Sequence, residues 1–200
     1  MTTPTFDFSK VSTPYFQLTE EQLDKLGNAM IFLSKAIPDL SKTKLLKLLY
    51  MLDELSISKS GIPFFNLQYK LWKLGPVVEE VFVELSDKLI KFEKYIDVKF
   101  ENGGAYIYPK IDFCDDEFSD NDLELLNDVS IRFLKTSAKE LIKYTHRLDS
   151  PWRNTAEVNG VYEKLEEGVI TSTDIIIDMK CLVNHNEYKK CIFEHYIEEH

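Results

Sequence analysis

His146 is the first residue of the chain whose surroundings suggest chemistry, because Asp149 follows it by three residues and Ser150 stands next to that aspartate. A histidine and an aspartate at this spacing on a helix can touch, and a nearby serine completes the residue types of a hydrolytic triad. No Gly-x-Ser-x-Gly elbow accompanies them and no oxyanion site is legible. We therefore interpret His146 as a packed, hydrogen-bonded brace at a helix C-terminus, where an imidazolium suits the helix dipole. A hydrolase that uses these residues with Asp53 remains an alternative.

The C-terminal region holds two cysteines and two histidines in paired four-residue steps: Cys181, His185, Cys191 and His195. If the chain turns near residues 184–186, two short helices could present all four side chains to one tetrahedral zinc ion. Structural zinc sites usually contain a tight Cys-x2-4-Cys knuckle, which is absent here, so the sequence favours no bound metal. The chain also lacks a Walker sequence and a dinucleotide fingerprint, and we expect no cofactor.

Asp53 is the carboxylate most in need of a partner, because it lies within an apolar helical pattern. It follows Leu49 by four residues and Tyr50 by three, so all three share a stripe of the predicted helix. Burying an unpaired carboxylate costs several kcal/mol or forces its protonation. The pattern favours a structural role, in which Asp53 accepts hydrogen bonds from a hydroxyl, an amide or a lysine, over a role in a binding or acid–base site.

The stretch from Ser41 to Glu84 is expected to position these residues. An apolar helix begins after Ser41 and carries leucines at three- and four-residue steps: Leu45, Leu48, Leu49, Leu52 and Leu55. A Gly-Pro turn and an aromatic segment follow. Pro76 then suits the first turn of a second helix, which is predicted to continue through Leu89.

Other helix starts follow from capping boxes, in which a Ser or Thr side chain and a residue three positions later satisfy free backbone N–H groups. Such pairs predict helices beginning at Thr19, Ser119, Ser137 and Thr171. The helix from Thr19 should end near Ala36, the helix from Ser137 at Pro151, and the helix from Thr171 near Leu182. A last helix is predicted over 186–198. Alternating apolar residues on both sides of Asn102-Gly103 predict a β-hairpin over 95–108.

The composition fits one folded domain. The chain has 200 residues, of which 44% are hydrophobic and 12% aromatic, enough for one sizeable core. Residues 1–18 form an N-terminal arm with several aromatic and proline residues, and residues 19–200 a single domain without internal repeats. The predicted fold class is α+β and predominantly α-helical, a compact helical domain with a small β-hairpin.

The formal net charge of −10 argues against nucleic acid and against an anionic membrane surface as partners, and suits a basic protein. Eight acids and no base lie between Lys110 and Arg132. Such runs usually form solvated loops and helix starts. The alternative is a docking surface for a partner, formed by Asp115, Asp116, Glu117 and Asp120.

The three cysteines form no disulfide framework, and no apolar segment behind basic residues marks a secretory signal. The apolar runs are too short to span a bilayer. We therefore expect a cytoplasmic chain with free thiols.

A set of residues resembles, in its order and spacing, the Panacea domain, an antitoxin domain of bacterial and phage toxin–antitoxin pairs with SocA-like members. The matching residues cover about 40–155 and comprise Lys44 to Tyr50 with Asp53, Gly61, Pro63, Trp72, Gly75-Pro76-Val77, Leu141, Thr145-His146 and Pro151-Trp152. The resemblance implies a mostly helical domain without catalytic residues. It also implies that a signature set forms one buried polar and aromatic network: Lys47, Tyr50, Asp53, Trp72, Gly75, Pro76, His146, Pro151 and Trp152.

The function implied by this resemblance is an antitoxin that binds and neutralises a cognate toxin protein, encoded next door. The alternative from the same family is a proteolytic adaptor, whose second partner is a protease. An enzyme, hydrolytic or metal-dependent, is the third possibility. The resemblance does not identify the toxin.

Overall fold

The computed structural model of the chain describes residues 18–87, 89–101 and 103–199. The arm expected over residues 1–18 therefore lies outside the described residues, except for Leu18, which is buried in the core. The described part is mostly helical, with two small two-stranded antiparallel sheets. This confirms the predicted α+β, predominantly helical class.

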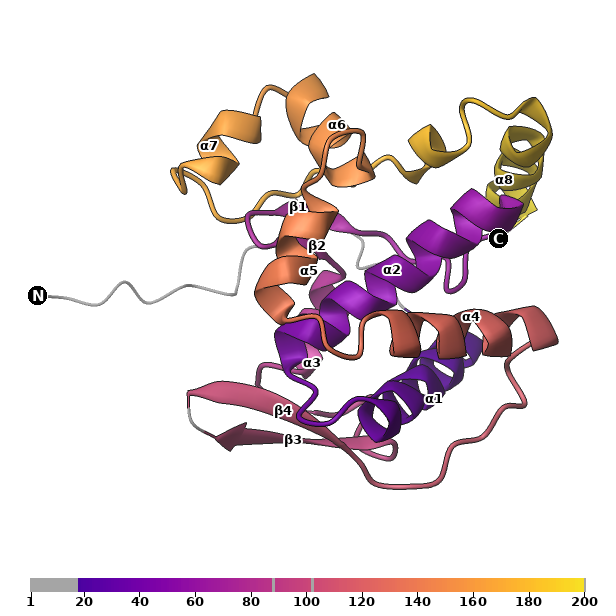
Figure 1. Cartoon of the computed structure of the whole chain (residues 1–200), viewed down its shortest axis with the longest axis vertical. Coiled ribbons are helices and arrows are strands. Elements are labelled where there is room, and N and C mark those ends of the chain that lie inside the picture. Colours follow the sequence, from indigo (N-terminus) through magenta and orange to yellow (C-terminus); the bar gives the residue numbers. More distant parts are fainter. Residues whose placement is uncertain (1–17, 88, 102, 200) are drawn as a thin grey trace, which may run out of the picture.

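Helix α2 (Lys42–Ser60) runs through the middle of the molecule (Figure 1). Its N-cap is Ser41, as predicted, and it ends at Gly61, whose φ of 84° allows the left-handed C-cap. The helix contacts α4 (Asp120–Arg132), α5 (Ala138–Thr145), α8 (Glu187–Glu199) and both sheets. Because neighbours pack against several of its faces, α2 buries polar as well as apolar side chains.

Helix α1 (Glu20–Ala36) and a β-hairpin lie on one side of α2 (Figure 1). The capping box of Thr19 and Gln22 begins α1, and the helix ends before Pro38, both as predicted. The hairpin consists of β3 (Ile96–Glu101) and β4 (Gly104–Pro109), with Val98 opposite Ile107. This confirms the hairpin, although Asn102 of its predicted turn lies outside the described residues.

The prediction of a helix from Pro76 to Leu89 is wrong. Gly75–Val77 forms strand β2, which pairs with β1 (Lys70–Trp72) in a second hairpin, and only Glu79–Glu84 is helical, as α3. Gly75 has a φ of 92°, which turns the chain sharply after Trp72. Pro76 therefore continues into extended backbone, which its fixed φ also permits.

The predicted helix from Thr171 to Leu182 is also largely wrong. Residues 171–177 lie alongside β1, with Leu71 N donating to Ile175 O over 2.9 Å and Ile177 N to Tyr69 O over 2.8 Å. Only Met179–Leu182 is helical, as the short 3-10 helix η1. The backbone of this segment is thus satisfied by β1 rather than by a helix.

The helices after the acidic loop begin as predicted. Ser119 and Ser137 cap α4 and α5 through complete capping boxes with Asp122 and Glu140. Helix α5, however, ends at Thr145, so the expectation that it continues to Pro151 is wrong. Pro151 instead opens α6 (Pro151–Val158), where proline at the first position loses no hydrogen bond, and α7 (Tyr162–Glu166) follows.

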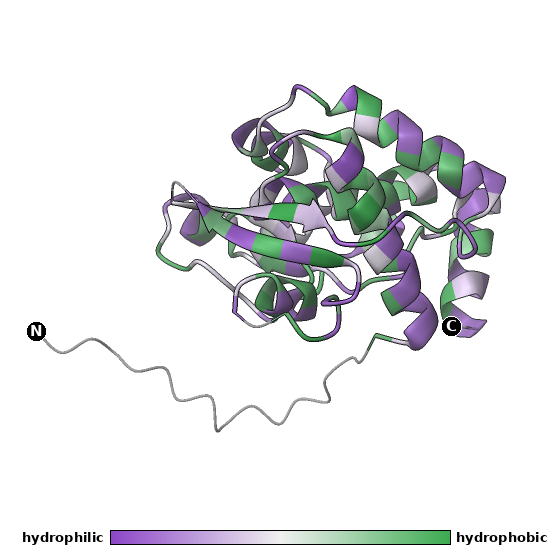
Figure 2. Ribbon diagram, turned by 90° about the horizontal axis from the view of Figure 1, so that it is seen from below, coloured by the Kyte–Doolittle hydropathy of each residue, from purple (hydrophilic) through white to green (hydrophobic). Residues whose placement is uncertain are grey.

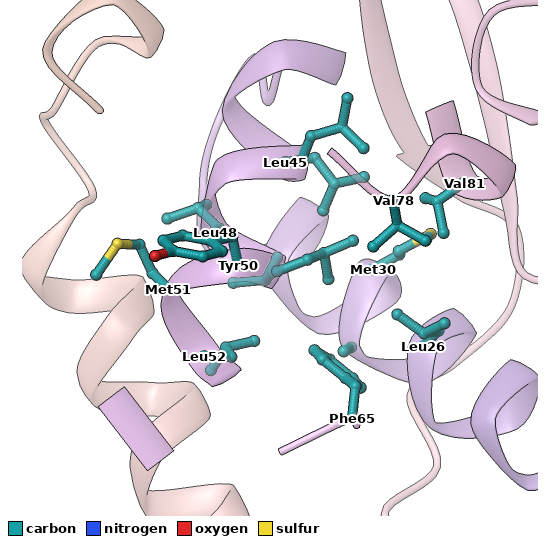
Figure 3. Packing of buried hydrophobic residues seen from close by; sticks show 14 of the residues in the cluster. Leu26, Met30, Leu45, Leu48, Tyr50, Met51, Leu52, Phe65, Val78 and Val81 are labelled. Carbon is teal, nitrogen blue, oxygen red and sulfur yellow. The ribbon is translucent and has the colours of Figure 1, made fainter. Parts of the chain in front are cut away.

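The hydrophobic core surrounds α2. Figure 3 shows Leu45 and Leu52 of α2 packed with Leu26 and Met30 of α1 and with the segment that leads into α3. In Figure 2 the hairpin strands alternate between hydrophilic and hydrophobic bands, as expected of strands with one face against the core. Among the described residues, no helix is both long enough and apolar enough to cross a membrane.

The packing of α1 against the β3–β4 hairpin leads to a first prediction. Gly27 faces the ring of Tyr95, and a Cβ built on Gly27 would lie 2.5 Å from that ring. Alanine raises helix propensity by about 1 kcal/mol. We nevertheless expect Gly27→Ala to lower the free energy of unfolding, because overpacking costs about 1–3 kcal/mol. Urea denaturation measures the change.

The double variant Gly27→Ala, Tyr95→Ala is the control, because it removes the ring that the new methyl group meets. Its loss of stability should be smaller than the sum of the two single losses. Additive losses would show that the contact between Gly27 and Tyr95 does not limit the packing here.

Candidate functional site

His146 and Trp152 form the centre of the candidate site, where α5 ends and α6 begins. Their rings are stacked with centroids 3.6 Å apart and planes inclined by 5°. Trp152 is fully buried, and its indole Nε1 donates to the carbonyl oxygen of Trp72 over 2.9 Å. The stack thereby fastens the start of α6 to β1.

His146 is neutral near neutral pH. Burial lowers its pKa to about 4, although the nearby Glu166 opposes this shift. Its Nδ1 lies 3.1 Å from the Glu166 carboxylate, which can only accept, so we infer that Nδ1 carries the proton. Nε2 is buried without a hydrogen-bond partner among the described residues. The expected imidazolium at the end of α5 is thus corrected: a neutral ring cannot stabilise the helix dipole as a cation does.

Lys47 lies at the centre of a second group, beneath the β1–β2 turn. Its side chain is fully buried, its Nζ donates to the carbonyl oxygen of Pro76 over 2.7 Å, and burial lowers its pKa to about 7. A Cβ on Gly75 would lie 2.6 Å from Thr145 Oγ1 and 3.1 Å from Lys47 Cε. Glycine is therefore required here for space as well as for its positive φ. The charge of Lys47 also contributes to the low pKa of His146.

Asp53 lies in a third group, on the next turns of α2. Its Oδ1 accepts from the backbone N–H of Phe65 and its Oδ2 from the hydroxyl of Tyr69, both over 2.7 Å. Burial raises the pKa of Asp53, and these two hydrogen bonds oppose the shift. The ring of Tyr50 packs edge-on against Tyr69, with centroids 5.1 Å apart. Both Asp53 oxygens thus have protein partners, one amide and one hydroxyl.

The signature residues therefore occupy neighbouring parts of the interior, along α2. His146, Pro151, Trp152 and Trp72 form one part, Lys47, Gly75 and Pro76 another, and Tyr50 with Asp53 the third. Trp72 is half-buried; its own Nε1 donates to Thr173 O over 3.2 Å. In the described part of the chain these groups lie in the interior, and Asp53 also lines a pocket bounded by the segments 63–69 and 176–180.

Several partners in this network were missed by sequence reasoning. Glu54 is 2% exposed and forms an ion pair with Arg147, which lies between α5 and α6. Tyr69 and Glu166 also take part, as described above. A signal was present for Glu54 and Arg147, since each follows a signature residue directly in the sequence. Nothing local, however, indicated that they pair with each other.

The suggested triad is not assembled. Ser150 is buried and caps α6 by accepting from Arg153 N over 3.1 Å, and Asp149 is exposed with a φ of 60°. No hydrogen bond joins His146, Asp149 and Ser150 in the described chain. His146 pairs with Glu166 instead. No contact joins His146 to Asp53 in the described chain.

The four candidate zinc ligands do not gather either. Within residues 18–87, 89–101 and 103–199, no group of three or more His, Cys, Asp or Glu side chains could hold a metal ion. Cys181 donates to the carbonyl oxygen of Asp178, burial raises the pKa of its thiol to about 11, and His195 pairs with Glu199 within α8. Cys191 and His185 are exposed. Among the described residues, these four side chains are therefore not brought together around one point.

The acidic residues divide into two sets. Asp112, Asp122 and Glu124 each form an ion pair with a lysine of α1 or α2, namely Lys35, Lys25 and Lys59. The remaining five are exposed and have no ion pair in the part of the chain that the structure describes. Asp128 lies further along α4, and the other four are those of the predicted docking surface: Asp115, Asp116, Glu117 and Asp120. They surround the start of α4.

One comparison with known proteins gives a match. A family model described as "Antitoxin SocA-like, Panacea domain" matches residues 45–153, more than half of the chain. The matched range begins in the first turn of α2 and ends in the first turn of α6, so it contains the signature residues from Lys47 to Trp152. No curated protein and no solved structure matches the chain.

The close approach of Gly75 to Thr145 leads to a second prediction. We expect Gly75→Ala to lower the free energy of unfolding by roughly 2–5 kcal/mol, because the new Cβ meets Thr145 and because a φ of 92° strains any residue with a side chain. Gly103→Ala is the matched control, since Gly103 has a φ of 76° but nothing within 4 Å. It should cost only about 1–2 kcal/mol. Equal losses in urea denaturation would contradict the proposed steric role.

The lowered pKa of His146 predicts how stability depends on pH. An unfolded histidine binds a proton near pH 6.5, whereas folded His146 does so only near pH 4. The unfolded state therefore binds more protons between these values, and stability falls by roughly 2–3 kcal/mol as the pH is lowered through this window. His146→Phe, which keeps a ring against Trp152, should reduce this loss.

Urea denaturation across the window measures the effect, as the difference between the variant and the unmodified protein. That difference removes the contribution of the carboxylates, which titrate in both. His185→Phe, at an exposed histidine, is the control and should leave the pH dependence unchanged. An unchanged slope in His146→Phe would show that His146 is not buried in its neutral form.

Proposed function

This chain belongs to the SocA-like antitoxin family with a Panacea domain, and we propose that it neutralises a cognate toxin protein by direct protein–protein contact. The match over residues 45–153 carries the proposal. In this proposal the matched region is the scaffold of an antitoxin from a bacterial or phage toxin–antitoxin pair, and the toxin is encoded next to it.

The state of the buried polar groups supports a binding role rather than catalysis. Lys47, Asp53 and Glu54 are three buried ionisable side chains of α2, and each is bonded to another segment of the same chain. A catalytic carboxylate or lysine needs to reach a substrate in a plausible pose. These three are occupied by internal contacts.

The unpaired acids at the start of α4 support this part of the surface as the place where the toxin binds. Nearby acids are neutralised by lysines of this chain, whereas Asp115, Asp116, Glu117 and Asp120 keep their charges free at the surface. A charged patch attracts an oppositely charged partner and raises the rate of association. With a net charge of −10, the chain suits a basic toxin surface.

Expression of the neighbouring gene tests the function. We expect that gene alone to arrest growth, and co-expression of this chain to restore it. The two proteins should also copurify. Growth that is unaffected by the neighbour, or arrest that this chain does not relieve, would contradict the proposal.

Neutralising the four acids tests the contact surface. The variant with Asp115→Asn, Asp116→Asn, Glu117→Gln and Asp120→Asn should bind the toxin about tenfold more weakly, mainly through slower association, and should lose most of the salt dependence of binding. Surface plasmon resonance at low and high salt measures both effects.

A control variant with the same net charge neutralises four exposed acids elsewhere on the surface. Its substitutions are Asp97→Asn, Glu163→Gln, Glu167→Gln and Glu198→Gln. It should bind as the unmodified protein does. Equal losses in the two variants would assign the effect to overall charge rather than to the acids around α4, while leaving the antitoxin role intact.

A further inference from the structure

Strand β3 has one edge without a neighbouring strand among the described residues. It lies on the outer side of its hairpin, with β4 between it and the helices (Figure 1). The far edge of β4 is bonded to the rest of the chain, since Ile107 N donates to Leu40 O over 2.9 Å. Unpaired backbone groups at a strand edge are a template for pairing with another strand.

The hydrogen bonds of the hairpin show which residues of β3 face this open edge. In an antiparallel pair, every second residue directs its N–H and C=O groups away from the neighbouring strand. Lys110 N donates to Tyr95 O over 2.9 Å, and this bond fixes the alternation. The residues whose backbone groups point outward are therefore Ile96, Val98 and Phe100.

Phe100 is the residue at which a second strand can be added. Ile96 N already donates to Phe92 O over 3.1 Å, and Val98 N donates to the carboxylate of Asp97 over 3.0 Å. By contrast, the N–H and C=O of Phe100 meet no hydrogen-bond partner in the described part of the chain. The aromatic ring of Phe100 is also 65% exposed.

The two neighbours of Phe100 carry opposite charges. Lys99 and Glu101 are exposed, and neither forms an ion pair with another described residue; Lys99 lies over the ring of Tyr108 at 4.7 Å. If a copy of the strand lies antiparallel with Phe100 opposite Phe100, each Lys99 lies opposite a Glu101. These flanking pairs are of the non-hydrogen-bonded kind, in which side chains approach most closely.

The edge is thus complementary to itself. A lysine on a strand edge normally opposes pairing, but here the glutamate two residues later supplies its counter-charge in a second copy. A pairing centred on Val98 would also place opposite charges together, Asp97 against Lys99. It would, however, displace the hydrogen bond of Val98 N and bring a second hairpin beside Phe92. The pairing centred on Phe100 breaks no hydrogen bond of the described structure.

We propose that two copies of this chain associate through β3, with Phe100 opposite Phe100 across a twofold axis, so that the two hairpins form one continuous antiparallel sheet. Each Phe100 N–H donates to the C=O of the other Phe100, and each Lys99 pairs with Glu101 of the other copy. The two exposed rings contact each other. Aromatic pairs and opposite-charge pairs between strands both stabilise a sheet. The same surface is used by both copies, and because it is small the association is weak.

Sedimentation velocity of the full chain tests this association. It needs no toxin, so its failure would leave the proposed antitoxin role untouched. We expect a reversible change from monomer to dimer with a dissociation constant between about 10 μM and 1 mM, the range of small interfaces. A chain that stays monomeric up to about 1 mM overturns the proposal.

Exchanging the two charges tests the register. Lys99→Glu alone and Glu101→Lys alone should each abolish the dimer, because like charges then lie opposite each other twice. An equimolar mixture of the two variants should dimerise again, since every glutamate then faces a lysine of the other variant. This recovery would also show that both variants are folded. A mixture that stays monomeric, or a single variant that still dimerises, overturns the proposal.

Asp97→Lys is the charge control. It changes the net charge by the same amount as Glu101→Lys, but Asp97 takes no part in the pairing centred on Phe100, so the dimer should persist. Loss of the dimer in Asp97→Lys would place the contact around Val98 and overturn the proposed register.

Substitution of the aromatic ring tests its contact. Phe100→Thr keeps a strand-forming residue and should weaken the association about tenfold, because the pair of rings is lost. Ile131→Thr on α4 is the matched control, since Ile131 is also 65% exposed, and it should leave the association unchanged. Equal weakening in both variants would assign the association to general surface hydrophobicity and overturn the contact at β3.

Discussion

The fold depends on giving partners to the polar side chains that α2 buries. This helix passes through the centre of the molecule, and its Lys47, Asp53 and Glu54 are each at most 2% exposed. Leaving such groups unpaired costs several kcal/mol. Lys47 is satisfied by the β1–β2 hairpin, Asp53 by the segment 65–69 and Glu54 by Arg147 at the α5–α6 turn. Three segments are thus docked on one helix at fixed positions, because each must bring its own donor or acceptor to a particular turn of α2.

Local signals account for what the sequence predicted well. Thr19, Ser41, Ser119 and Ser137 begin helices because the hydrogen bonds of a cap lie within four residues of it. The failure at Pro76 arises from the turn at Gly75, whose φ of 92° leads Pro76 into strand β2. The failure at Thr171 arises from contacts that are distant in sequence. Thr173 Oγ1 donates to Leu71 O over 2.7 Å, about a hundred residues away, and Asp174 pairs with Lys70. The polar residues that suggest a helix cap thereby serve a strand pairing, which no local pattern can reveal.

The same limit applies to the candidate site. A family resemblance indicated which residues belong together, and it included His146, Trp152 and Lys47. It could not indicate that a lysine carbon would press against Gly75, or that Glu166 would approach His146 from α7. The protonation of His146 was also out of reach, since its pKa depends on burial and on the opposing effects of Glu166 and Lys47. The residues that belong to the site can therefore be identified from the sequence, whereas their pKa values and protonation states depend on the packed structure.

Internal pairing also constrains how a partner is recognised. A toxin could bind Lys47, Asp53 or Glu54 only by breaking the contacts that hold the hairpin, the 65–69 segment or the α5–α6 turn on α2. Removing one member of a buried polar pair costs about 3–5 kcal/mol for charged pairs, which is a large share of the stability of a domain. Recognition that leaves the domain folded must use surface groups instead. The free charges around α4 are such groups, and they lie at the periphery of the scaffold that α2 organises. The buried polar groups of α2 thus determine which surfaces remain for binding a partner, but they do not contact the partner themselves.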